Sequence, residues 1–300
     1  MSIPIVRTVT ELRARLELAR SQQKKIAVIP TMGALHEGHL SLVAEGSRRA
    51  EIVVVTIFVN PTQFGPGEDF ERYPRNLEKD TELAGSAGGT IIFAPNRAEM
   101  YPEGEQTRVS VSPLSLGLCG KNRPKHFEGV ATVVAKLFNA VGSGTYLFGT
   151  KDYQQWRLIE RMARDLLFPV EIVGMPIVRE PGGLAMSSRN AFLTPEDRIR
   201  ALAIPRALQA ALALYKTGER DALKLVKMTS SLMEEAGIIV DYVEAREPKT
   251  LNELELVPQG GSLLIAVAGR LGETRLIDNL VLSAKTAHLP QLSSLDRNNE

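Results

Sequence analysis

The sequence predicts an α/β fold: a doubly wound parallel sheet followed by a smaller α+β domain. Short, almost wholly apolar segments alternate with segments of helical periodicity over the first 180 residues. The apolar segments are rich in Val and Ile, which is typical of strands covered on both faces of a parallel sheet. The alternation indicates βαβ units, and it stops at the Pro-Gly-Gly sequence of residues 181–183.

Residues 1–179 are expected to form the doubly wound domain. Strands are predicted over residues 26–29, 52–59, 90–94, 145–148 and 170–178. Helices are predicted over residues 40–50, 74–87, 127–141 and 152–166. Right-handed crossovers would place the loops after the strands along one edge of the sheet, where ligands bind. Segment 95–125 has little helical signal, and a loop of this length is often a lid or a binding element.

Residues 180–283 are expected to form the smaller domain, joined through a flexible hinge at residues 180–183. Helices are predicted over about residues 195–216 and 221–236; Thr194 supplies a hydroxyl cap for the first and Pro195 its rigid first turn. Strands are predicted over residues 241–246, 262–268 and 274–279. The remaining residues, 284–300, end in a polar stretch and are expected to form a flexible tail.

Composition restricts the class of protein. The chain has 300 residues, 44% hydrophobic and 24% charged, as in globular proteins and unlike disordered chains. Its formal net charge of +1 argues against a nucleic-acid partner, because such binding depends on many phosphate contacts. No apolar run approaches the roughly 20 residues of a membrane span, so no membrane partner is expected. No signal peptide is visible, and a single cysteine, Cys119, favours a reducing, cytoplasmic setting.

The strongest local pattern runs from Pro30 to Leu40, between the first predicted strand and the first predicted helix. Gly33 and Gly38 let the backbone approach a ligand closely, and free N–H groups at a helix start favour an anion. His36 and His39 are three residues apart, so at a helix start they lie on one face. Two imidazoles there are able to donate to phosphate oxygens and to stabilise charge as it develops.

Two other interpretations of this pair are open. One is a capped helix with two surface histidines, which a bare His-x-x-His would favour. The other is a metal-binding pair, which is weaker because no cysteine or third histidine is nearby. The flanking glycines and the position directly after a buried strand favour the phosphate site.

A second polar segment, residues 182–190, lies where the two predicted domains meet. The hydroxyls of Ser187 and Ser188 and the guanidinium of Arg189 form a set of phosphate donors. A loop at this position suits closure over a polyphosphate, and a polar linker is the alternative. Taken with the histidine segment, it predicts a nucleotide held from two sides.

These two segments resemble the nucleotide-binding motifs of the class I aminoacyl-tRNA-synthetase-like nucleotidyltransferases, a superfamily with a Rossmann-like sheet. The chain is closer still to the pantoate–β-alanine ligases, also called pantothenate synthetases. The similar stretches are residues 30–39, 58–64, 72–75, 123–127, 149–155 and 183–190. They follow the family's order over most of residues 26–195.

The resemblance implies an ATP-dependent enzyme that joins (R)-pantoate to β-alanine, a step toward coenzyme A. Pantoate would first attack the α-phosphorus of ATP, giving pantoyl adenylate and pyrophosphate. The amine of β-alanine would then attack the activated carbonyl, giving pantothenate and AMP. A carboxylate and a triphosphate repel each other, so donor groups must screen them, and holding the pair in line lowers the barrier further.

The resemblance also implies the residues that contact ATP and carry catalysis. His39 is similar to the residue that the family uses as proton donor, although a charge-stabilising N–H would serve in its place. Lys151 is the best single candidate for stabilising the pentacoordinate phosphorus, and Asp152 would hold the ribose or orient Lys151. The catalytic set is His36, His39, Lys151 and Arg189. The ATP-binding set is Met32, Gly33, Ala34, Leu35, His36, Glu37, Gly38, His39, Gly149, Thr150, Lys151, Asp152, Val178, Met186, Ser187, Ser188 and Arg189.

The expected substrate contacts are Gln63, Gln155 and Arg123. Gln63 and Gln155 are similar to pantoate-binding residues of the family, and a neutral amide suits a hydroxy acid because it both donates and accepts. Arg123 lies at the exit of the long loop and is expected to face substrate. Asp80 is a candidate ligand of Mg²⁺, and a solvated helix carboxylate is an equally good interpretation. The resemblance also suggests a homodimer.

Two further functions stay open. A related cytidylyl- or adenylyltransferase would stop after nucleotide transfer and would need no amine. A nucleotide-binding module would bind ATP without turnover, whether or not Lys151 is replaced. A tRNA synthetase is not expected, because the small second half and the balanced charge leave little surface for a large polyanion.

Overall fold

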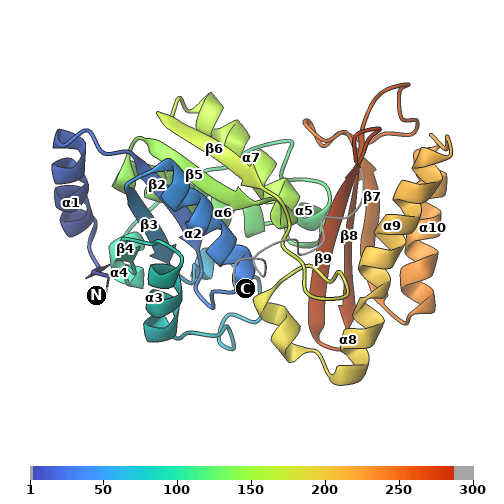
Figure 1. The fold of residues 1–300 in the computed structure, drawn as a ribbon, viewed down its shortest axis with the longest axis horizontal. Coiled ribbons are helices and arrows are strands. Elements are labelled where there is room, and N and C mark those ends of the chain that lie inside the picture. Colours follow the sequence, from blue (N-terminus) through green and yellow to red (C-terminus); the bar gives the residue numbers. More distant parts are fainter. Residues whose placement is uncertain (1–2, 287–300) are drawn as a thin grey trace, which may run out of the picture. The chain divides into compact units, whose positions relative to one another are not determined.

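The N-terminal part of the chain forms a parallel sheet, as the sequence predicts, and the sheet has six strands where five are predicted (Figure 1). The structure is a computed structural model, and it describes residues 3–286. The strands are β1 (Ile5–Val6), β2 (Ile26–Thr31), β3 (Ile52–Ile57), β4 (Ile91–Phe93), β5 (Gly144–Gly149) and β6 (Val170–Met175). β1 is not among the predicted strands, because two residues are too few to show a period.

The helices over the same stretch of sequence are α1 (Val9–Ser21), α2 (Glu37–Arg49), α3 (Leu77–Ser86), α4 (Arg97–Met100), α5 (Cys119–Asn122), α6 (His126–Val141) and α7 (Tyr153–Asp165). α2 packs against β2 and β3, while α1 packs against α6. α1 is missing from the sequence prediction, although its start carries a cap signal: the Thr8 hydroxyl accepts the N–H of Glu11. Its buried side chains include Leu12 and Leu16, four residues apart on one face.

The order of the strands explains where a ligand would bind. The sheet runs β1-β4-β3-β2-β5-β6, so β2 pairs with β3 on one side and with β5 on the other. The chain moves from β2 outward to β4 and returns to the other side at β5, which makes β2 and β5 the switch point of the topology. Ligands of open α/β sheets bind outside the carboxyl ends of the strands at such a point. These ends are Thr31 and Gly149.

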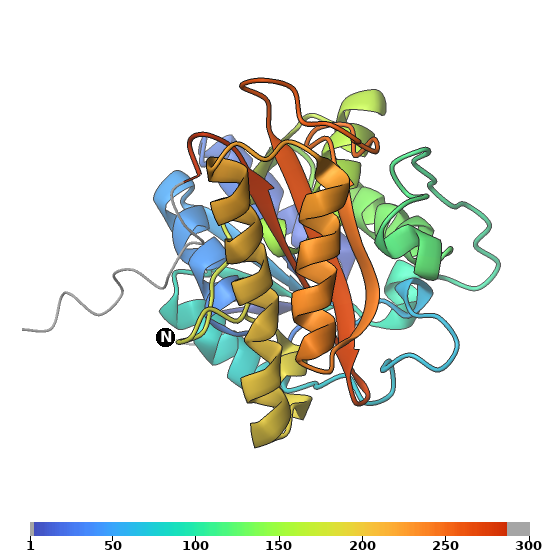
Figure 2. The same cartoon turned by 90° about the vertical axis from the view of Figure 1, so that its right-hand side faces the viewer.

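A second, antiparallel sheet follows, with strands β7 (Ile239–Arg246), β8 (Leu263–Leu271) and β9 (Thr274–Leu282) in that order. Helices α9 (Ala203–Lys216) and α10 (Ala222–Glu235) pack against each other and against this sheet. Figure 2 shows both helices lying across one face of the three strands. The predicted α+β character of this region is confirmed.

The predicted single helix over residues 195–216 is wrong, because two helices occupy this stretch. α8 (Pro195–Ala201) ends at Ala201, Leu202 lies between the two helices, and α9 begins at Ala203. Pro205 lies in the first turn of α9, where its missing N–H costs nothing, whereas inside a continuous helix it would remove a hydrogen bond. The cap at Thr194 forms as predicted: its hydroxyl accepts the N–H of Asp197.

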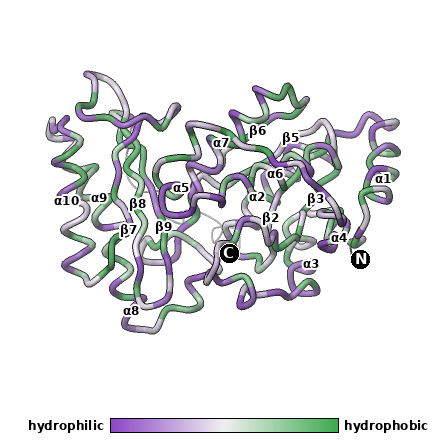
Figure 3. Tube along the Cα trace, turned by 180° about the vertical axis from the view of Figure 1, so that it is seen from behind, coloured by the Kyte–Doolittle hydropathy of each residue, from purple (hydrophilic) through white to green (hydrophobic). Residues whose placement is uncertain are grey.

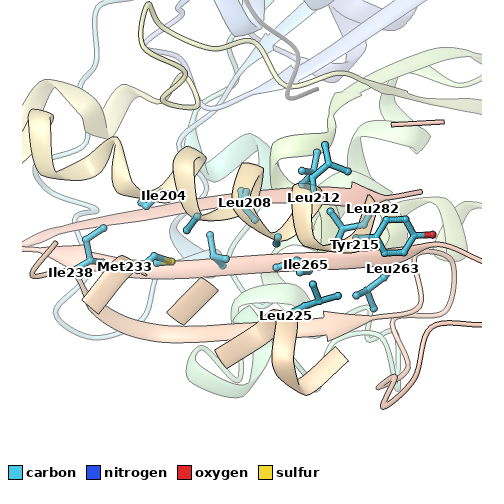
Figure 4. Packing of buried hydrophobic residues seen from close by; sticks show 14 of the residues in the cluster. Ile204, Leu208, Leu212, Tyr215, Leu225, Met233, Ile238, Leu263, Ile265 and Leu282 are labelled. Atoms are coloured by element: carbon cyan, nitrogen blue, oxygen red, sulfur yellow. The ribbon is translucent and has the colours of Figure 1, made fainter. Parts of the chain in front are cut away.

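A continuous apolar core lies between the helices α9 and α10 and the antiparallel sheet (Figure 4). Ile204, Leu208 and Leu212 are spaced four residues apart on α9 and point to the sheet. Leu263 and Ile265 on β8 meet them from the sheet side. Tyr215 completes the cluster, and its hydroxyl donates to the carbonyl of Gly261 at 2.9 Å.

The chain divides into two compact units. The first consists of the described residues up to Leu116, with 123–150 and 155–175; the second consists of 117–122, 151–154 and the described residues from Pro176 onward. Along α1 in the first unit and α10 in the second, hydrophilic and hydrophobic residues alternate, as expected for helices with one covered face (Figure 3). Of the expected tail, residues 287–300 lie outside the described part of the chain.

Candidate active site

A tight turn of unusual backbone conformation joins β2 to α2. Gly33 has φ +84° and Ala34 has φ +51°, so two successive residues occupy the left-handed region. The hydroxyl of Thr31 accepts the N–H of Gly33 at 3.1 Å and donates to the carbonyl of Thr56 at 2.7 Å. The turn is thereby tied to the neighbouring strand β3, and its shape is set before any ligand binds.

Asp80 holds the other side of this turn. Its Oδ2 accepts the N–H of Ala34 at 2.9 Å, and its Oδ1 accepts the N–H of Leu35 at 2.8 Å. Asp80 lies in the first turn of α3 and is only 3% exposed. The carboxylate therefore serves the backbone of the predicted ATP-binding turn, and its expected role as a ligand of Mg²⁺ stays a prediction.

His36 and His39 cap the N-terminus of α2. The Nδ1 of His36 accepts the N–H of Gly38 at 3.1 Å, and the Nδ1 of His39 accepts the N–H of His36 at a longer 3.4 Å. The two rings lie 4.1 Å apart, centroid to centroid. The same-face arrangement that the spacing predicts is confirmed.

These cap bonds determine which ring nitrogen carries hydrogen. A nitrogen that accepts a hydrogen bond is not protonated, so in the neutral form of each ring the hydrogen is on Nε2. Both imidazoles are thus N–H donors at Nε2, at a helix N-terminus whose partial positive charge favours an anion. The pair is suited to donate to phosphate oxygens.

The loop after β3 carries Gln63, the expected pantoate contact, in the short 3₁₀ helix η1 (Pro61–Gln63). Its Nε2 donates to the Sδ of Met32 at 2.9 Å, and its Oε1 accepts from the Nδ2 of Asn60 at 3.1 Å. Asn60 is 1% exposed and also donates to the carbonyl of Gly129 on α6. Gln63 is therefore placed beside the histidine turn, as neighbouring strands in the sheet predict.

Arg123 and His126 hold the backbone of Gln63. Arg123 donates through Nη2 to the Gln63 carbonyl at 3.1 Å and through Nε to Glu68 at 2.6 Å. The Nδ1 of His126 lies 2.8 Å from the same carbonyl, and since a carbonyl only accepts, this Nδ1 carries hydrogen. Burial raises the pKa of Glu68, but the hydrogen bond and charge of Arg123, a hydrogen bond from the Gly65 backbone and the charge of His126 together lower it, so the pKa lies below its usual value. These bonds show that Arg123 supports the backbone of a substrate-contact candidate, and its own expected contact with substrate stays a prediction.

The turn after β5 begins with Gly149 and Thr150 and continues into the 3₁₀ helix η2 (Thr150–Asp152). The hydroxyl of Thr150 donates to the carbonyl of Met175, which joins the ends of β5 and β6. Lys151 is the first residue of this turn that belongs to the second unit. The residue as a whole is partly exposed, but its ammonium is buried, and this burial lowers the pKa of the ammonium. Its carbonyl accepts from the Nδ2 of Asn279 on β9 at 2.9 Å.

Residues 178–190 form a closed turn within the second unit. The N–H of Met186 donates to the carbonyl of Val178 at 3.0 Å, and the N–H of Glu180 donates to that of Leu184 at 2.8 Å. The glycines at the tip, 182 and 183, have φ +96° and +98°. Ser187 caps the 3₁₀ helix η3 (Ser188–Phe192) by accepting the N–H of Arg189. The predicted phosphate donors Ser187, Ser188 and Arg189 thus lie together at the start of η3.

Each unit gathers part of the predicted site. In the first unit, Met32 to His39, Gln63 and Gly149 follow three neighbouring strands, and Gln155 lies in the first turn of α7. The second unit contains Lys151, Val178 and the segment Met186–Arg189, and its Asp152 is exposed. Glu37 is exposed at the first position of α2.

Comparisons with known proteins show the family of the chain. A family sequence model described as Pantoate-beta-alanine ligase matches residues 4–281. A pantothenate synthetase of Geobacter sulfurreducens is 51% identical over 279 residues, which make up 93% of this chain and 98% of that protein. One of Myxococcus xanthus is 50% identical over 286 residues, 95% of this chain and 98% of that protein.

The chain belongs to the pantoate–β-alanine ligase family. It is thus an enzyme of the ligase class, and the interpretation as a binding module without activity is set aside. The family membership that the motifs predict is confirmed.

Solved structures of the family share the fold. The pantothenate synthetase of Thermus thermophilus has a TM-score of 0.86 and 46% identity, covering 93% of this chain and 99% of that one. The pantoate–β-alanine ligase of Francisella tularensis, crystallised with beta-gamma ATP and β-alanine, has a TM-score of 0.75 and 31% identity, covering 93% and 97%. The Rossmann-like sheet with a smaller second sheet is therefore the family's fold.

Several residues of the site do not appear in the sequence prediction. Asn60 holds the side chain of Gln63, Asn279 on β9 holds the backbone of Lys151, and Asp278 accepts the N–H of Asn279. All three are buried polar residues, and neither their roles nor the turn-holding role of Asp80 follow from the sequence. A signal is present for Asp278 and Asn279, because they interrupt the apolar strand sequence Leu-Ile-Asp-Asn-Leu-Val-Leu. Buried polar pairs in such a strand indicate a specific partner.

Residues 3–286 contain no group of three His, Cys, Asp or Glu side chains arranged to hold a metal ion. Within the same residues, none of the helices has the length and apolar character to cross a bilayer.

Proposed function

We propose that this enzyme condenses (R)-pantoate with β-alanine at the expense of ATP, through a pantoyl-adenylate intermediate. The observation that carries the proposal is the pair of capped histidines at the carboxyl end of β2, with both Nε2–H groups suited to donate, in a chain of the pantoate–β-alanine ligase family. The Francisella relative crystallised with beta-gamma ATP and β-alanine supports the same two substrates here.

The proposed reaction has two steps. In the first, a carboxylate oxygen of pantoate bonds to the α-phosphorus of ATP, the bond from this phosphorus to the bridging oxygen breaks, and pyrophosphate leaves. In the second, the neutral amine of β-alanine bonds to the pantoyl carbonyl carbon, the bond to the AMP oxygen breaks, and the amine loses a proton to solvent. The products are pantothenate, AMP and pyrophosphate.

The histidine turn would act in the first step. Negative charge grows on the oxygens of the α-phosphorus and on the leaving pyrophosphate, and donors already in place stabilise it without reorganising. The Nε2–H groups of His36 and His39 and the N-terminus of α2 are such donors. Whether His39 also delivers a proton does not alter this role.

The second unit would supply positive charge. Lys151 is assigned to the pentacoordinate phosphorus and Arg189 to the phosphates, where a guanidinium makes bidentate contacts. Ser187 and Ser188 add hydroxyl donors. In this proposal residues 180–283 close over ATP once it is bound, and water is excluded from the adenylate.

The first unit would bind pantoate through Gln63 and Gln155. Gln63 is held by Asn60 on its side chain and by Arg123 on its backbone, so its amide is oriented before the substrate arrives. An oriented amide both donates to the carboxylate and accepts from a hydroxyl of pantoate. Val178 and the backbone of Met32–Leu35 are assigned to the nucleotide.

Magnesium, oligomeric state and location are part of the proposal. Mg²⁺ usually binds through substrate phosphates plus one or two carboxylates, so we expect it to arrive with ATP as part of the substrate. Asp80 is its proposed carboxylate, although both oxygens already accept backbone N–H groups. We further propose a homodimer and a cytoplasmic location.

The test measures product formation by the purified chain with ATP, Mg²⁺, pantoate and β-alanine. We expect AMP and pantothenate in equal amounts, and pantoate-dependent exchange of pyrophosphate into ATP when β-alanine is omitted. Lys151→Ala should abolish most of both signals. Pyrophosphate release with no use of β-alanine would instead identify a nucleotidyltransferase, and absence of pantoate-dependent AMP would reject the proposal.

A further inference from the structure

A buried ion pair lies next to Lys151 in the second unit, and neither member belongs to the predicted site. Arg179 donates through Nη1 to Asp278 Oδ2 at 2.6 Å and through Nη2 to Asp278 Oδ1 at 2.9 Å. Both side chains are 1% exposed. The Nη1 of Arg179 also donates to the carbonyl of Gly183 at the tip of the 178–190 turn. The carboxylate of Asp278 is therefore held at both oxygens by one guanidinium.

Asp278 and Lys151 line the same small cavity. The cavity has a volume of about 10 Å³ and is also lined by Ser187 and Asn190. Asn190 donates through Nδ2 to Glu180 and to the Ala185 carbonyl, while its buried Oδ1 has no partner among the described residues. The lining of the cavity thus combines a lysine, whose ammonium is a donor only, with the Asp278 carboxylate and an amide oxygen that is an acceptor only.

Asn279, the next residue of β9, holds the backbone of Lys151. Its Nδ2 donates to the Lys151 carbonyl at 2.9 Å, and its own N–H donates to Asp278 Oδ1 at 2.8 Å. Two adjacent residues of β9 therefore lie at the lysine: Asn279 bonds to its backbone, and Asp278 lines the same cavity as its side chain. Asn279 is only 6% exposed, so the bond is shielded from water.

We propose that Asp278 and Asn279 are positioning residues for Lys151: Asn279 fixes its backbone, and Asp278, held by Arg179, supplies the negative charge beside its ammonium. The role of Lys151 in adenylate formation rests on the proposed function, whereas its placement by β9 does not. A buried carboxylate clamped by an arginine is suited to the task, because it cannot swing away when ATP brings negative charge to the site.

The charges around Lys151 give the sign of the effect. Burial lowers the pKa of Lys151; Asp152 and Asp278 oppose this, while Arg189 and Arg275 add to it. Asp152 is exposed and partly screened by water, but Asp278 is buried. Removing the charge of Asp278 should lower the pKa further, so that more of the lysine is neutral at a given pH and less is available to stabilise phosphate.

The test is competitive acetylation of the full chain over a range of pH, with mass spectrometry of the peptide that contains Lys151. Only the neutral amine reacts, so the pH dependence reports its protonation without requiring activity. In Asp278→Asn we expect the midpoint of Lys151 labelling to move to lower pH and the rate below the midpoint to rise several-fold. The double variant Arg179→Gln, Asp278→Asn should also move the midpoint to lower pH, and it leaves no buried charge unpaired.

Glu244→Gln is the matched control. Glu244 lies in the same sheet and is paired with Arg246, and its carboxylate is not among the charges that act on the pKa of Lys151. It should leave the midpoint unchanged. An unchanged midpoint in both folded Asp278 variants would overturn the charge part of the proposal. Inactive wild-type protein with shifted labelling in the variants would reject the proposed function but not the placement of Lys151.

Asn279→Ala tests the other part of the proposal. It leaves every charge in place, so the labelling midpoint should stay while pantoate-dependent pyrophosphate exchange falls by between about tenfold and 100-fold, the loss that a misplaced catalytic group causes. The KM for β-alanine should not change. Wild-type exchange in this variant would show that the bond to the Lys151 carbonyl has no positioning role.

Discussion

Asp80 Oδ2 accepts the N–H of Ala34 at 2.9 Å, although the two residues are 46 positions apart in the chain. Ala34 has a positive φ, a conformation that is unfavourable for alanine, and Asp80 Oδ1 holds the next N–H, that of Leu35. The carboxylate therefore stabilises a strained turn from behind.

Replacement of this carboxylate should weaken ATP binding. In Asp80→Asn, one of the two backbone N–H groups would face an NH₂ group and lose its acceptor, at a cost of about 1–3 kcal/mol. We expect a lower melting temperature and a higher Kd for ATP by calorimetry. Glu78→Gln, an exposed carboxylate in the same turn of α3, should change neither. Unaltered ATP binding in Asp80→Asn would contradict the turn-holding role.

Gly33 should not accept a side chain. A Cβ at this position would lie 2.9 Å from Asp80 Oδ2 and 3.1 Å from Ile57 Cγ2, on a backbone with φ +84°. We expect Gly33→Ala to lower the free energy of unfolding by more than the roughly 1 kcal/mol that the positive φ alone costs, and to abolish ATP binding. Gly67→Ala is the control, because Gly67 has φ +77° and open space around its Cβ direction. If urea unfolding shows the same decrease in the free energy of unfolding for both variants, the close approach of the added Cβ to Asp80 has no effect.

His39 combines two functions on its two ring nitrogens, and two variants separate them. Asn at this position can accept the N–H of His36 near the place of Nδ1, and Gln can present an N–H near the place of Nε2. We expect His39→Asn to keep its stability but to lose about 2.7–4 kcal/mol of transition-state stabilisation in adenylate formation. His39→Gln should retain more of the single-turnover rate. A faster single turnover in His39→Asn than in His39→Gln would show that the cap bond at Nδ1, and not the Nε2–H, is what catalysis requires.

Replacement of Glu68 should raise the KM for pantoate more than the KM for ATP. It pairs with Arg123, which donates to the Gln63 carbonyl, and the pair keeps the pKa of Glu68 below its ordinary value of 4.5. The carboxylate is thus ionised at and above that pH, and protonation at lower pH should loosen the loop. We expect Glu68→Gln to raise the KM for pantoate at neutral pH, whereas the KM for ATP stays. Glu71→Gln, exposed in the same loop, is the control.

The strands and most helices could be predicted because each has its own local signal. β2, β3 and β5 are apolar runs, and α6 and α10 are periodic, so their burial follows from period and composition. The break between α8 and α9 was not predicted, because the pattern of apolar residues continues across Leu202 and only Pro205 marks it. The sequence does not predict β1 because this strand has too few residues, and it does not predict α1 because this helix is rich in charged residues.

The sequence alone determined the alternation of the fold, the position of the histidine turn after a buried strand, and the family. These depend on neighbours along the chain: a glycine, a cap or an apolar run acts on residues a few positions away. The packing of the chain was needed to show that Asp80 holds Ala34 and Leu35, that Arg123 supports Gln63, and that Asn279 bonds to the backbone of Lys151. Such partners lie tens of residues apart, and a buried polar group finds its partner only when packing excludes the water that would otherwise satisfy it.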